Sequence, residues 1–262
     1  MRNQQLFIMD FSNFDTFIFD LDGTIWEWDN LFPGVKETIR KLKLKGKKIL
    51  FVSNNTFFSR SRLTKKLNDL GIKTEKSDVI NSGYATSMFI KGYYKNPKVM
   101  AVGKGVAEDL QQAKIKVVQR PPADIVVVGQ DHDFSMEKLA MIYRTINENT
   151  HLIAAARGKY FPTKKGMLPG AGLILEMIES MTNVKAKITG KPSDFMCYLV
   201  KSAVNSDMSK VLFVGDELDS DIMTGKKLGC KTCLVKTGVW VEGDDADVKP
   251  DFVIDSVANI NV

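Results

Sequence analysis

The sequence predicts an α/β fold: a doubly wound core built on a parallel sheet, with a smaller α/β domain inserted into it. Two observations predict this fold. Short apolar runs alternate along the chain with segments whose apolar residues recur at helical spacing. In addition, two polar motifs expected at one sheet edge are separated by far more chain than the ~30 residues of one strand–helix–strand unit. The 262 residues, 44% of them hydrophobic, suffice for two packed domains.

The first apolar run, 17–19, ends in Asp20-Leu21-Asp22-Gly23-Thr24 and predicts a buried strand with acids at its carboxyl end. That end of an open α/β sheet is where ligands bind. Asp20 and Asp22 point to the same side of the strand, so they repel unless a cation or a shared proton intervenes. The chemistry that fits is a nucleophilic Asp beside an acid/base Asp, with a hard divalent ion between them and a phosphate. For this motif alone, a solvated turn or a calcium loop is the alternative.

A second strand, Ile49–Val52, ends in Ser53-Asn54-Asn55. A right-handed strand–helix–strand crossover places Ser53 at the same sheet edge as Asp20. A hydroxyl followed by the exposed backbone amides of Asn54 and Asn55 suits a phosphate cradle. An ordinary Ser-Asn turn is the alternative.

The other elements follow from the same two periodicities. We expect a loop at 25–32, packed by its two tryptophans Trp26 and Trp28, before the first helix. Helices are expected at 33–46, 59–70, 84–90, 106–113, 136–146, 173–178, 192–204 and 222–228, and further strands at 78–81, 99–102, 125–128, 152–155, 211–215, 232–235 and 252–254.

Two later motifs carry candidate site residues. Lys191 stands just before Pro192 and Ser193, which suit a capped helix start, and a lysine there can hold a phosphate as a point charge. One surface lysine among many is the alternative. Asp216 ends the apolar strand 211–215 and is the natural third oxygen ligand of a metal-dependent phosphate site. An acidic, solvated turn is the alternative.

The long segment between Ser53 and Lys191 predicts the domain organisation. Residues 83–186 read as a complete small α/β layer without a nucleophile motif, so they form a cap inserted over the sheet edge that holds the acids. Residues 1–82 and 187–262 form the doubly wound, Rossmann-like core.

Composition excludes several classes of protein. No apolar stretch approaches the ~18 residues of a membrane helix, and Met1–Asp10 lacks the features of a signal peptide. Three cysteines without a metal-ligand pattern indicate a reducing compartment, so we expect a cytoplasmic protein and read Cys230 and Cys233 as core residues. The charge of +6 comes from scattered lysines, compatible with an anionic small substrate but not typical of a nucleic-acid-binding protein.

Taken together, the four motifs resemble the signatures of the haloacid dehalogenase (HAD) superfamily. Their order, their positions at strand ends and the insertion between the second and third resemble its NagD-like branch, which includes p-nitrophenyl, phosphoglycolate and pyridoxal phosphatases. The resemblance covers essentially the whole chain. It extends to Trp26, Pro33-Gly34, Pro162-Thr163 and Leu168-Pro169-Gly170-Ala171-Gly172.

The resemblance implies roles for the acidic motifs. Asp20 would attack phosphorus and form an aspartyl-phosphate, and Asp22, oriented by Thr24, would protonate the leaving oxygen and then deprotonate the attacking water. Mg²⁺ would be bound by the Asp20 carboxylate, the Asp22 carbonyl and Asp216, with Asp221 supporting these ligands.

The resemblance also implies that Ser53, the Asn54 and Asn55 turn and Lys191 hold the phosphoryl oxygens. The chain departs from the branch in the cap, where Ala156-Arg157-Gly158 replaces a frequent Asn-Pro-Asp. Arg157 and Lys159 therefore either recognise an anionic part of the substrate or are solvated.

The expected function is a Mg²⁺-dependent phosphatase of small phosphorylated metabolites, without nucleic-acid or membrane partners. Two alternatives stay open: a regulatory module that binds a phosphate ligand with little turnover, and a metal-independent dehalogenase. A homodimer formed through the cap is left open as well.

Overall fold

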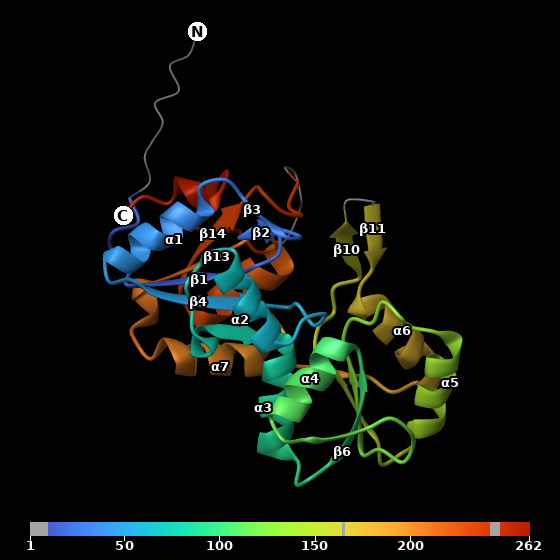
Figure 1. Cartoon of the computed structure of the whole chain (residues 1–262). Coiled ribbons are helices and arrows are strands. Elements are labelled where there is room, and N and C mark those ends of the chain that lie inside the picture. The colour runs from blue at the N-terminus through green and yellow to red at the C-terminus, as the bar shows by residue number, and fades with distance from the viewer. Residues whose placement is uncertain (1–9, 164–165, 242–246) are drawn as a thin grey trace. The chain divides into compact units, whose positions relative to one another are not determined.

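The computed structural model of the chain describes residues 10–163, 166–241 and 247–262 (Figure 1). The expectation of no signal peptide concerns the N-terminus, and residues 1–9 lie outside the described residues. Part of the acidic loop 238–250 lies outside them as well. None of the helices in the described ranges is both long and apolar enough to cross a membrane.

The chain divides into two compact units, each described here by itself. The first comprises Met1–Phe51, Leu70–Ile72 and Val204–Val262, and the second comprises Val52–Asp69 and Lys73–Ala203. The division into a core of 1–82 plus 187–262 and a cap of 83–186 stays a prediction.

A six-stranded sheet has the strand order β15-β14-β13-β1-β4-β5. The first unit contains its parallel strands β15, β14, β13 and β1 and most of β4, whereas the end of β4 and the edge strand β5 belong to the second unit. The strands are β1 (Thr16–Phe19), β4 (Lys48–Ser53), β5 (Val79–Asn81), β13 (Val211–Gly215), β14 (Lys231–Val235) and β15 (Phe252–Ile254). The order along the sheet reverses between β1 and β13, so the topological switch point, where such sheets bind ligands, lies between these two strands.

Apolar runs explain the core of this unit. Every residue of β1 and β13 is buried, and the rings of Phe17 and Phe19 stack at 6.2 Å between centroids. The other elements of the first unit are the hairpin β2 (Trp26–Glu27) and β3 (Asn30–Leu31), α1 (Val35–Leu44), the short turns η2 (Met208–Lys210) and η4 (Val257–Asn259), the π-helical turn η3 (Leu218–Ile222) and α8 (Met223–Leu228).

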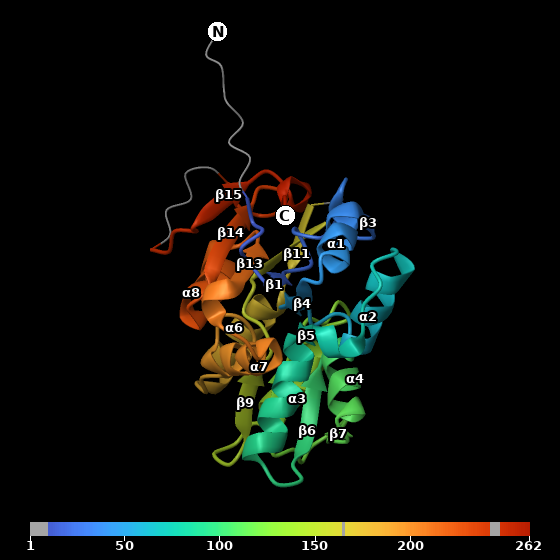
Figure 2. The same cartoon turned by 90° about the vertical axis from the view of Figure 1, so that its left-hand side faces the viewer.

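The second unit contains a five-stranded parallel sheet in the order β12-β9-β8-β6-β7. Its strands β9, β6 and β7 are labelled in Figure 2. Its strands are β6 (Lys98–Val102), β7 (Lys116–Val118), β8 (Ile125–Val128), β9 (His151–Ala154) and β12 (Lys187–Ile188), and an antiparallel hairpin is formed by β10 (Tyr160–Thr163) and β11 (Gly166–Pro169). The helical elements are α2 (Arg60–Asp69), η1 (Lys76–Asp78), α3 (Ser82–Tyr93), α4 (Lys104–Gln112), α5 (Met136–Thr145), α6 (Ala171–Thr182) and α7 (Asp194–Val204).

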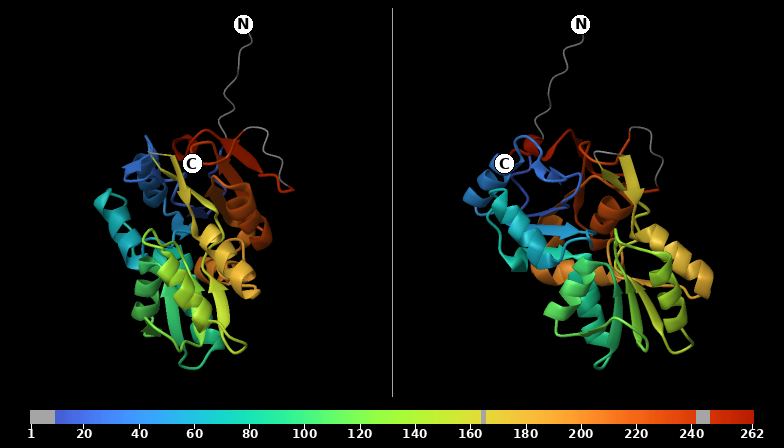
Figure 3. Two further views of the ribbon diagram at one scale, coloured as in Figure 1. Left: turned by 90° about the vertical axis from the view of Figure 1, so that its right-hand side faces the viewer. Right: turned by 45° about the vertical axis from the view of Figure 1, so that its right-hand side comes forward.

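Helices cover both faces of this sheet (Figure 3), because alternate residues of its buried strands point to opposite faces. On one face, Val126 and Val128 pack with apolar residues of α5 and α6. On the other, Ile125 and Val127 pack with residues of α3 and α4. The chain thus has the predicted α/β fold, with a doubly wound parallel core and an inserted smaller α/β domain.

Most predicted helices and strands are found, and the differences are local. The loop 25–32 contains the β2–β3 hairpin, and β7, β12 and the β10–β11 hairpin were not predicted. The helix expected from Pro192 begins at Asp194 instead, because Ser193 is its cap and accepts the Met196 amide at 3.2 Å. Cys230 and Cys233 are buried core residues as expected, and burial raises the pKa of the Cys233 thiol to about 12.

Candidate active site

Asp20 lies at the switch point of the six-stranded sheet. Register pairs Phe19 with Val214, and the Asp20 amide continues the ladder by donating to the Val214 carbonyl at 2.9 Å. The side chain of Asp20 is buried. The run of apolar residues before it therefore places a charged group at the carboxyl end of a central strand, as the sequence predicts.

Asp20, Asp216 and Asp221 form a buried acidic cluster. Each offers one carboxylate oxygen, and these three atoms lie within 4.8 Å of one another. Three carboxylates this close repel strongly in a buried environment. Oxygen ligands of this kind suit a hard divalent cation such as Mg²⁺, so the donor set fits the metal that the sequence motifs imply.

Asp221 shapes the loop that carries Asp216. Its Oδ2 accepts the backbone amides of Asp216 and Glu217, each at 3.1 Å. A Cβ on Gly215 would lie 2.3 Å from the Asp221 side chain, so only glycine leaves room there. The η3 turn thus bends the chain back after β13 and holds Asp216 at the strand end.

The Asp216 carboxylate is enclosed by backbone from two other loops. Its Oδ2 accepts the Val239 amide at 2.9 Å, and a Cβ on Gly23 or Gly238 would lie 2.3 or 1.8 Å from the same oxygen. Gly23 also has φ +81°, a conformation that favours glycine. Backbone approaches this acid so closely that its position is fixed before any ligand binds.

The resemblance implies that Thr24 orients Asp22, but the side-chain hydrogen bond to Asp22 comes from Trp26, and the Thr24 hydroxyl bonds to Asp216 instead. The Thr24 hydroxyl donates to Asp216 Oδ1 at 3.3 Å, and the buried Trp26 indole donates from Nε1 to Asp22 Oδ1 at 2.9 Å. Trp26 packs the loop as expected, but it also orients the acid/base candidate Asp22. The sequence shows only that Trp26 follows Asp22 by four residues. That spacing predicts a contact in a helix, but this segment is a tight turn, so the bond to Asp22 was not predicted.

In the second unit, Ser53, Asn54 and Lys191 are brought together. The Asn54 carboxamide bonds to both backbone groups of Lys191, and the buried Lys191 ammonium donates to the Val52 carbonyl at 2.9 Å. Ser53 Oγ accepts the Asn55 amide at 3.0 Å, a bond that does not use the hydroxyl hydrogen. Two motifs far apart in sequence are thus joined through the Asn54 side chain and the Val52 carbonyl.

Asn55 has a local structural role as well. Its Oδ1 accepts the amides of Phe57 and Phe58 at 3.1 and 3.0 Å, which fixes the turn that leads into α2.

The two cap residues singled out from the sequence, Arg157 and Lys159, are exposed and form ion pairs with acids of α6. The pairs are Arg157 with Glu179 at 3.6 Å and Lys159 with Glu176 at 2.8 Å.

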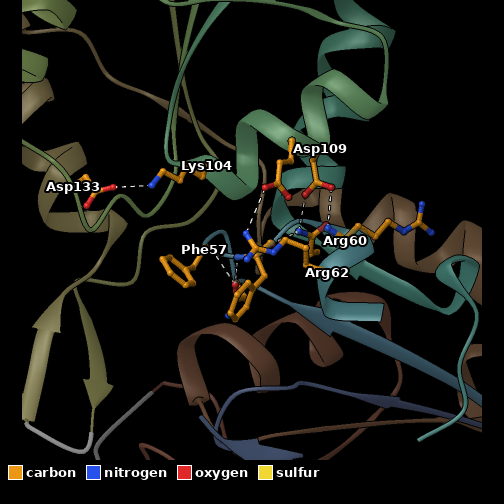
Figure 4. A network of polar contacts seen from close by, with 10 residues as sticks. Phe57, Arg60, Arg62, Lys104, Asp109 and Asp133 are labelled. Atoms are coloured by element: carbon orange, nitrogen blue, oxygen red, sulfur yellow. Dashed lines mark hydrogen bonds and ion pairs between the residues drawn. The ribbon is translucent and has the colours of Figure 1, made fainter. Parts of the chain in front are cut away.

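A further buried acid, Asp109 of α4, was not singled out from the sequence (Figure 4). Its Oδ1 accepts the Arg60 amide at the start of α2, and its Oδ2 accepts the Asn81 carboxamide at 2.8 Å. Burial raises the pKa of Asp109 from its ordinary 3.8 to about 6, although these hydrogen bonds oppose the rise. A packing role for Asp109 follows, because it ties the starts of α2 and α3 to α4.

In the first unit Asp20 and Asp216 lie together with Asp221, and in the second unit Asn54 is hydrogen-bonded to Lys191. The catalytic, metal-binding and phosphate-binding roles of these residues stay predictions. That the two groups meet around one phosphate stays a prediction.

Comparisons with known proteins agree with the motifs. Residues 17–116 match the family described as haloacid dehalogenase-like hydrolase, and residues 188–260 match the family described as HAD-hydrolase-like. The chain is 30% identical to the sugar-phosphatase AraL of Bacillus subtilis, over 93% of this chain and 90% of that protein. It is 31% identical to phosphoglycolate phosphatase 2 of Arabidopsis thaliana, over 95% and 93% of the two chains.

A solved structure gives the same result. The p-nitrophenyl phosphatase of Archaeoglobus fulgidus superposes with a TM-score of 0.87 at 31% identity, covering 94% of this chain and 97% of that chain. Sequence and fold agree over nearly the full length, and the named relatives all hydrolyse phosphate esters by name. The chain therefore belongs to the haloacid dehalogenase-like hydrolases, in their NagD-like, 4-nitrophenylphosphatase branch, and is a phosphatase that acts on phosphoric monoesters.

Proposed function

We propose that this phosphatase depends on Mg²⁺ and hydrolyses small phosphomonoesters through an aspartyl-phosphate on Asp20. The observation that carries the proposal is the buried cluster of Asp20, Asp216 and Asp221, whose oxygens lie within 4.8 Å of one another. A metal-independent dehalogenase has no need of such a cluster. A regulatory module with little turnover has no need of an acid/base group held beside the nucleophile.

The Asp20 and Asp216 carboxylates and the Asp22 carbonyl would hold the ion, and Asp221 supports them through the amides of Asp216 and Glu217. When bound, Mg²⁺ supplies positive charge that offsets the acids and the phosphoryl oxygens. The glycines that enclose Asp216 keep its carboxylate in place, so little reorganisation is needed on binding.

In the first chemical step, an Asp20 carboxylate oxygen attacks phosphorus and the bond from phosphorus to the ester oxygen breaks. Asp22, in its acid form, donates a proton to the departing oxygen, so the alcohol leaves neutral. In the second step, water attacks phosphorus, the bond to Asp20 breaks and Asp22 takes up the proton of the water. Inorganic phosphate leaves, and both acids return to their starting states. The Trp26 indole orients Asp22 throughout.

The cluster of Ser53, the Asn54 amide and Lys191 would bind the phosphoryl oxygens through one hydroxyl, one backbone amide and one ammonium group. Lys191 is buried, so its charge is little screened and its attraction for a dianion is strong. The named relatives act on a sugar phosphate and on phosphoglycolate by name. We therefore place the substrate among small phosphorylated metabolites, in line with the net charge of +6.

The test is release of inorganic phosphate from a panel of sugar phosphates, nucleotides, phosphoglycolate and pyridoxal phosphate, with Mg²⁺ and with excess EDTA. We expect turnover of at least one ester that EDTA abolishes and added Mg²⁺ restores. Asp20→Asn should fold normally and lose turnover, whereas Asp219→Asn, an exposed acid of the same chemistry, should keep it. Equal activity with and without EDTA would contradict the dependence on Mg²⁺. Near-normal activity of Asp20→Asn would contradict the covalent mechanism.

A further inference from the structure

The side chain of Asn54 connects three segments of the second unit. Its Oδ1 accepts the Lys191 amide and the Ser82 hydroxyl, both at 2.8 Å, and its Nδ2 donates to the Lys191 carbonyl at 3.1 Å. These segments are the loop after β4, the start of α3 and the stretch before α7. One carboxamide therefore holds the point where the chain returns from the five-stranded sheet.

Only a carboxamide can make this set of bonds. It presents an acceptor to the N–H of Lys191 and a donor to the carbonyl of the same residue, and its partners decide which end is oxygen. An aspartate at position 54 would face the Lys191 carbonyl with a second acceptor, and alanine would make none of the bonds. Because both backbone groups of Lys191 are held, the direction in which its side chain leaves the backbone is set.

The far end of the Lys191 side chain is held too. Its ammonium donates to the Val52 carbonyl at 2.9 Å, and only 4% of the residue is exposed. A free lysine side chain has about 2 kcal/mol of rotamer entropy, which would otherwise be lost when it binds a phosphate. The backbone next to Lys191 is closely packed at Gly190, because a Cβ there would lie 2.6 Å from Asn54 Oδ1 and 2.2 Å from the Ala155 carbonyl oxygen.

We propose that the Asn54 carboxamide is a positioning residue: it fixes the backbone of Lys191 so that the ammonium group is already in place for the phosphoryl group of the substrate. This side-chain role is separate from phosphate binding by the Asn54 backbone amide, and it rests on the proposed function of Lys191. It deepens that function by assigning to one polar side chain the preorganisation of the phosphate site.

The chain offers a matched control in Asn68 of α2. Its carboxamide also makes three hydrogen bonds within the second unit, to the Thr64 carbonyl, the Thr74 carbonyl and the Thr74 amide. Asn54→Ala and Asn68→Ala thus each remove a carboxamide that hydrogen-bonds the backbone of the second unit. Only the first of them acts on a residue of the proposed phosphate site.

The experiment measures kcat and KM with p-nitrophenyl phosphate, and the inhibition constant of inorganic phosphate, for Asn54→Ala, Asn68→Ala, Lys191→Ala and the double variant of Asn54 and Lys191. We expect Asn54→Ala to lower kcat/KM about 100-fold and to weaken inhibition by phosphate, because a misplaced binding group costs about that much. Asn68→Ala should leave both values within about twofold. In the Lys191→Ala background, the Asn54 substitution should have little further effect, because the two residues act as one unit.

The outcomes separate the inference from the proposed function. If Lys191→Ala leaves kcat/KM and phosphate inhibition unchanged, the proposed role of Lys191 is wrong. If Lys191→Ala is impaired but Asn54→Ala behaves like Asn68→Ala, or its effect adds in full to that of Lys191→Ala, the positioning role is overturned. Should Asn54→Ala fail to fold, Ser82→Ala removes one donor to Asn54 Oδ1 and should lower kcat/KM a few-fold, again only while Lys191 is present.

Discussion

The cluster of Asp20, Asp216 and Asp221 leads to a prediction about the free energy of unfolding of Asp216→Asn. The variant should be more stable than the parent protein without metal and less stable with it. Two unit charges 4.8 Å apart, the largest separation within the cluster, repel by about 3.5 kcal/mol at an effective dielectric constant of about 20. Asp216→Asn removes two of the three pairwise repulsions in the cluster. Its amide can still accept from the Val239 amide at the Oδ2 position and donate to the Thr24 hydroxyl at the Oδ1 position, so these two contacts survive. Without metal, the variant should therefore be more stable than the parent protein, by about 1 kcal/mol or more.

With Mg²⁺ the order should reverse. Binding stabilises the parent protein by about 2.7 kcal/mol when the ion is present at about 100 times its dissociation constant. Asp216→Asn replaces a charged ligand by a neutral one, so it should gain much less. Urea unfolding followed by circular dichroism, in excess EDTA and in excess MgCl₂, gives the four free energies of unfolding that are needed.

Asp219→Asn is the control for this experiment, since Asp219 lies in the same turn but is exposed. Its free energy of unfolding should stay within about 0.5 kcal/mol of the parent, and it should respond to Mg²⁺ as the parent does. Two results would refute the reasoning. One is an Asp216→Asn protein no more stable than the parent in EDTA, and the other is one that keeps the full stabilisation by Mg²⁺.

Three further predictions follow from single contacts. Trp26→Phe keeps the buried ring but removes the donor to Asp22, and a hydrogen bond to a charged group is worth about 1.5–3 kcal/mol, so kcat for p-nitrophenyl phosphate should fall about tenfold or more. Gly238→Ala brings a Cβ to 1.8 Å from Asp216 Oδ2, and calorimetry should show Mg²⁺ affinity reduced by about tenfold or more. Because burial raises the pKa of Asp109 to about 6, the folded state binds this proton more tightly than the unfolded chain. Its contribution to stability should fall as pH rises from about 4 to about 6, by up to about 3 kcal/mol, and urea unfolding of Asp109→Asn should lack this slope.

Each of these predictions has its own control. Trp28→Phe, on the same hairpin, should change kcat less than Trp26→Phe does. Gly92→Ala meets no atom within 4 Å and should leave Mg²⁺ affinity unchanged. Asp124→Asn should keep the pH dependence of the parent protein. A Gly238→Ala protein with normal affinity, or an Asp109→Asn protein with the slope of the parent, contradicts the corresponding contact.

The core sheets could be predicted from the sequence because burial on both faces makes their strands continuous apolar runs. Both Val211–Gly215 and Ile125–Val128 are fully buried along their length. The β10–β11 hairpin gave no such signal, since residues 166–169 of its second strand are all exposed and end in a proline. Two-residue strands such as β2 and β3 are too short to show any periodicity.

The sequence allowed prediction of which site residues stand at the strand ends. It did not allow prediction of the hydrogen bonds that orient their side chains. Asp20, Asp216 and Lys191 stand where apolar runs stop, which the sequence displays directly. The bonds from Trp26 to Asp22 and from Asn54 to Lys191 depend on turn geometry and on chain return, which no local pattern encodes. The ion pairs of Arg157 and Lys159 with α6 likewise follow from tertiary packing rather than from spacing.

The adjacency of Ser82 and Gly190 has a consequence for how the chain can vary. Both residues lie beside the Asn54 carboxamide, and a Cβ on Gly190 would come within 2.6 Å of the Ser82 hydroxyl. The long stretch from 83 to 189 therefore starts and finishes at nearly one point. Closing so long a loop adds only about 0.6 kcal/mol for each doubling of its length. A stretch of different size or sequence, grafted from a relative between these two anchors, should leave the scaffold intact and transfer a new substrate preference.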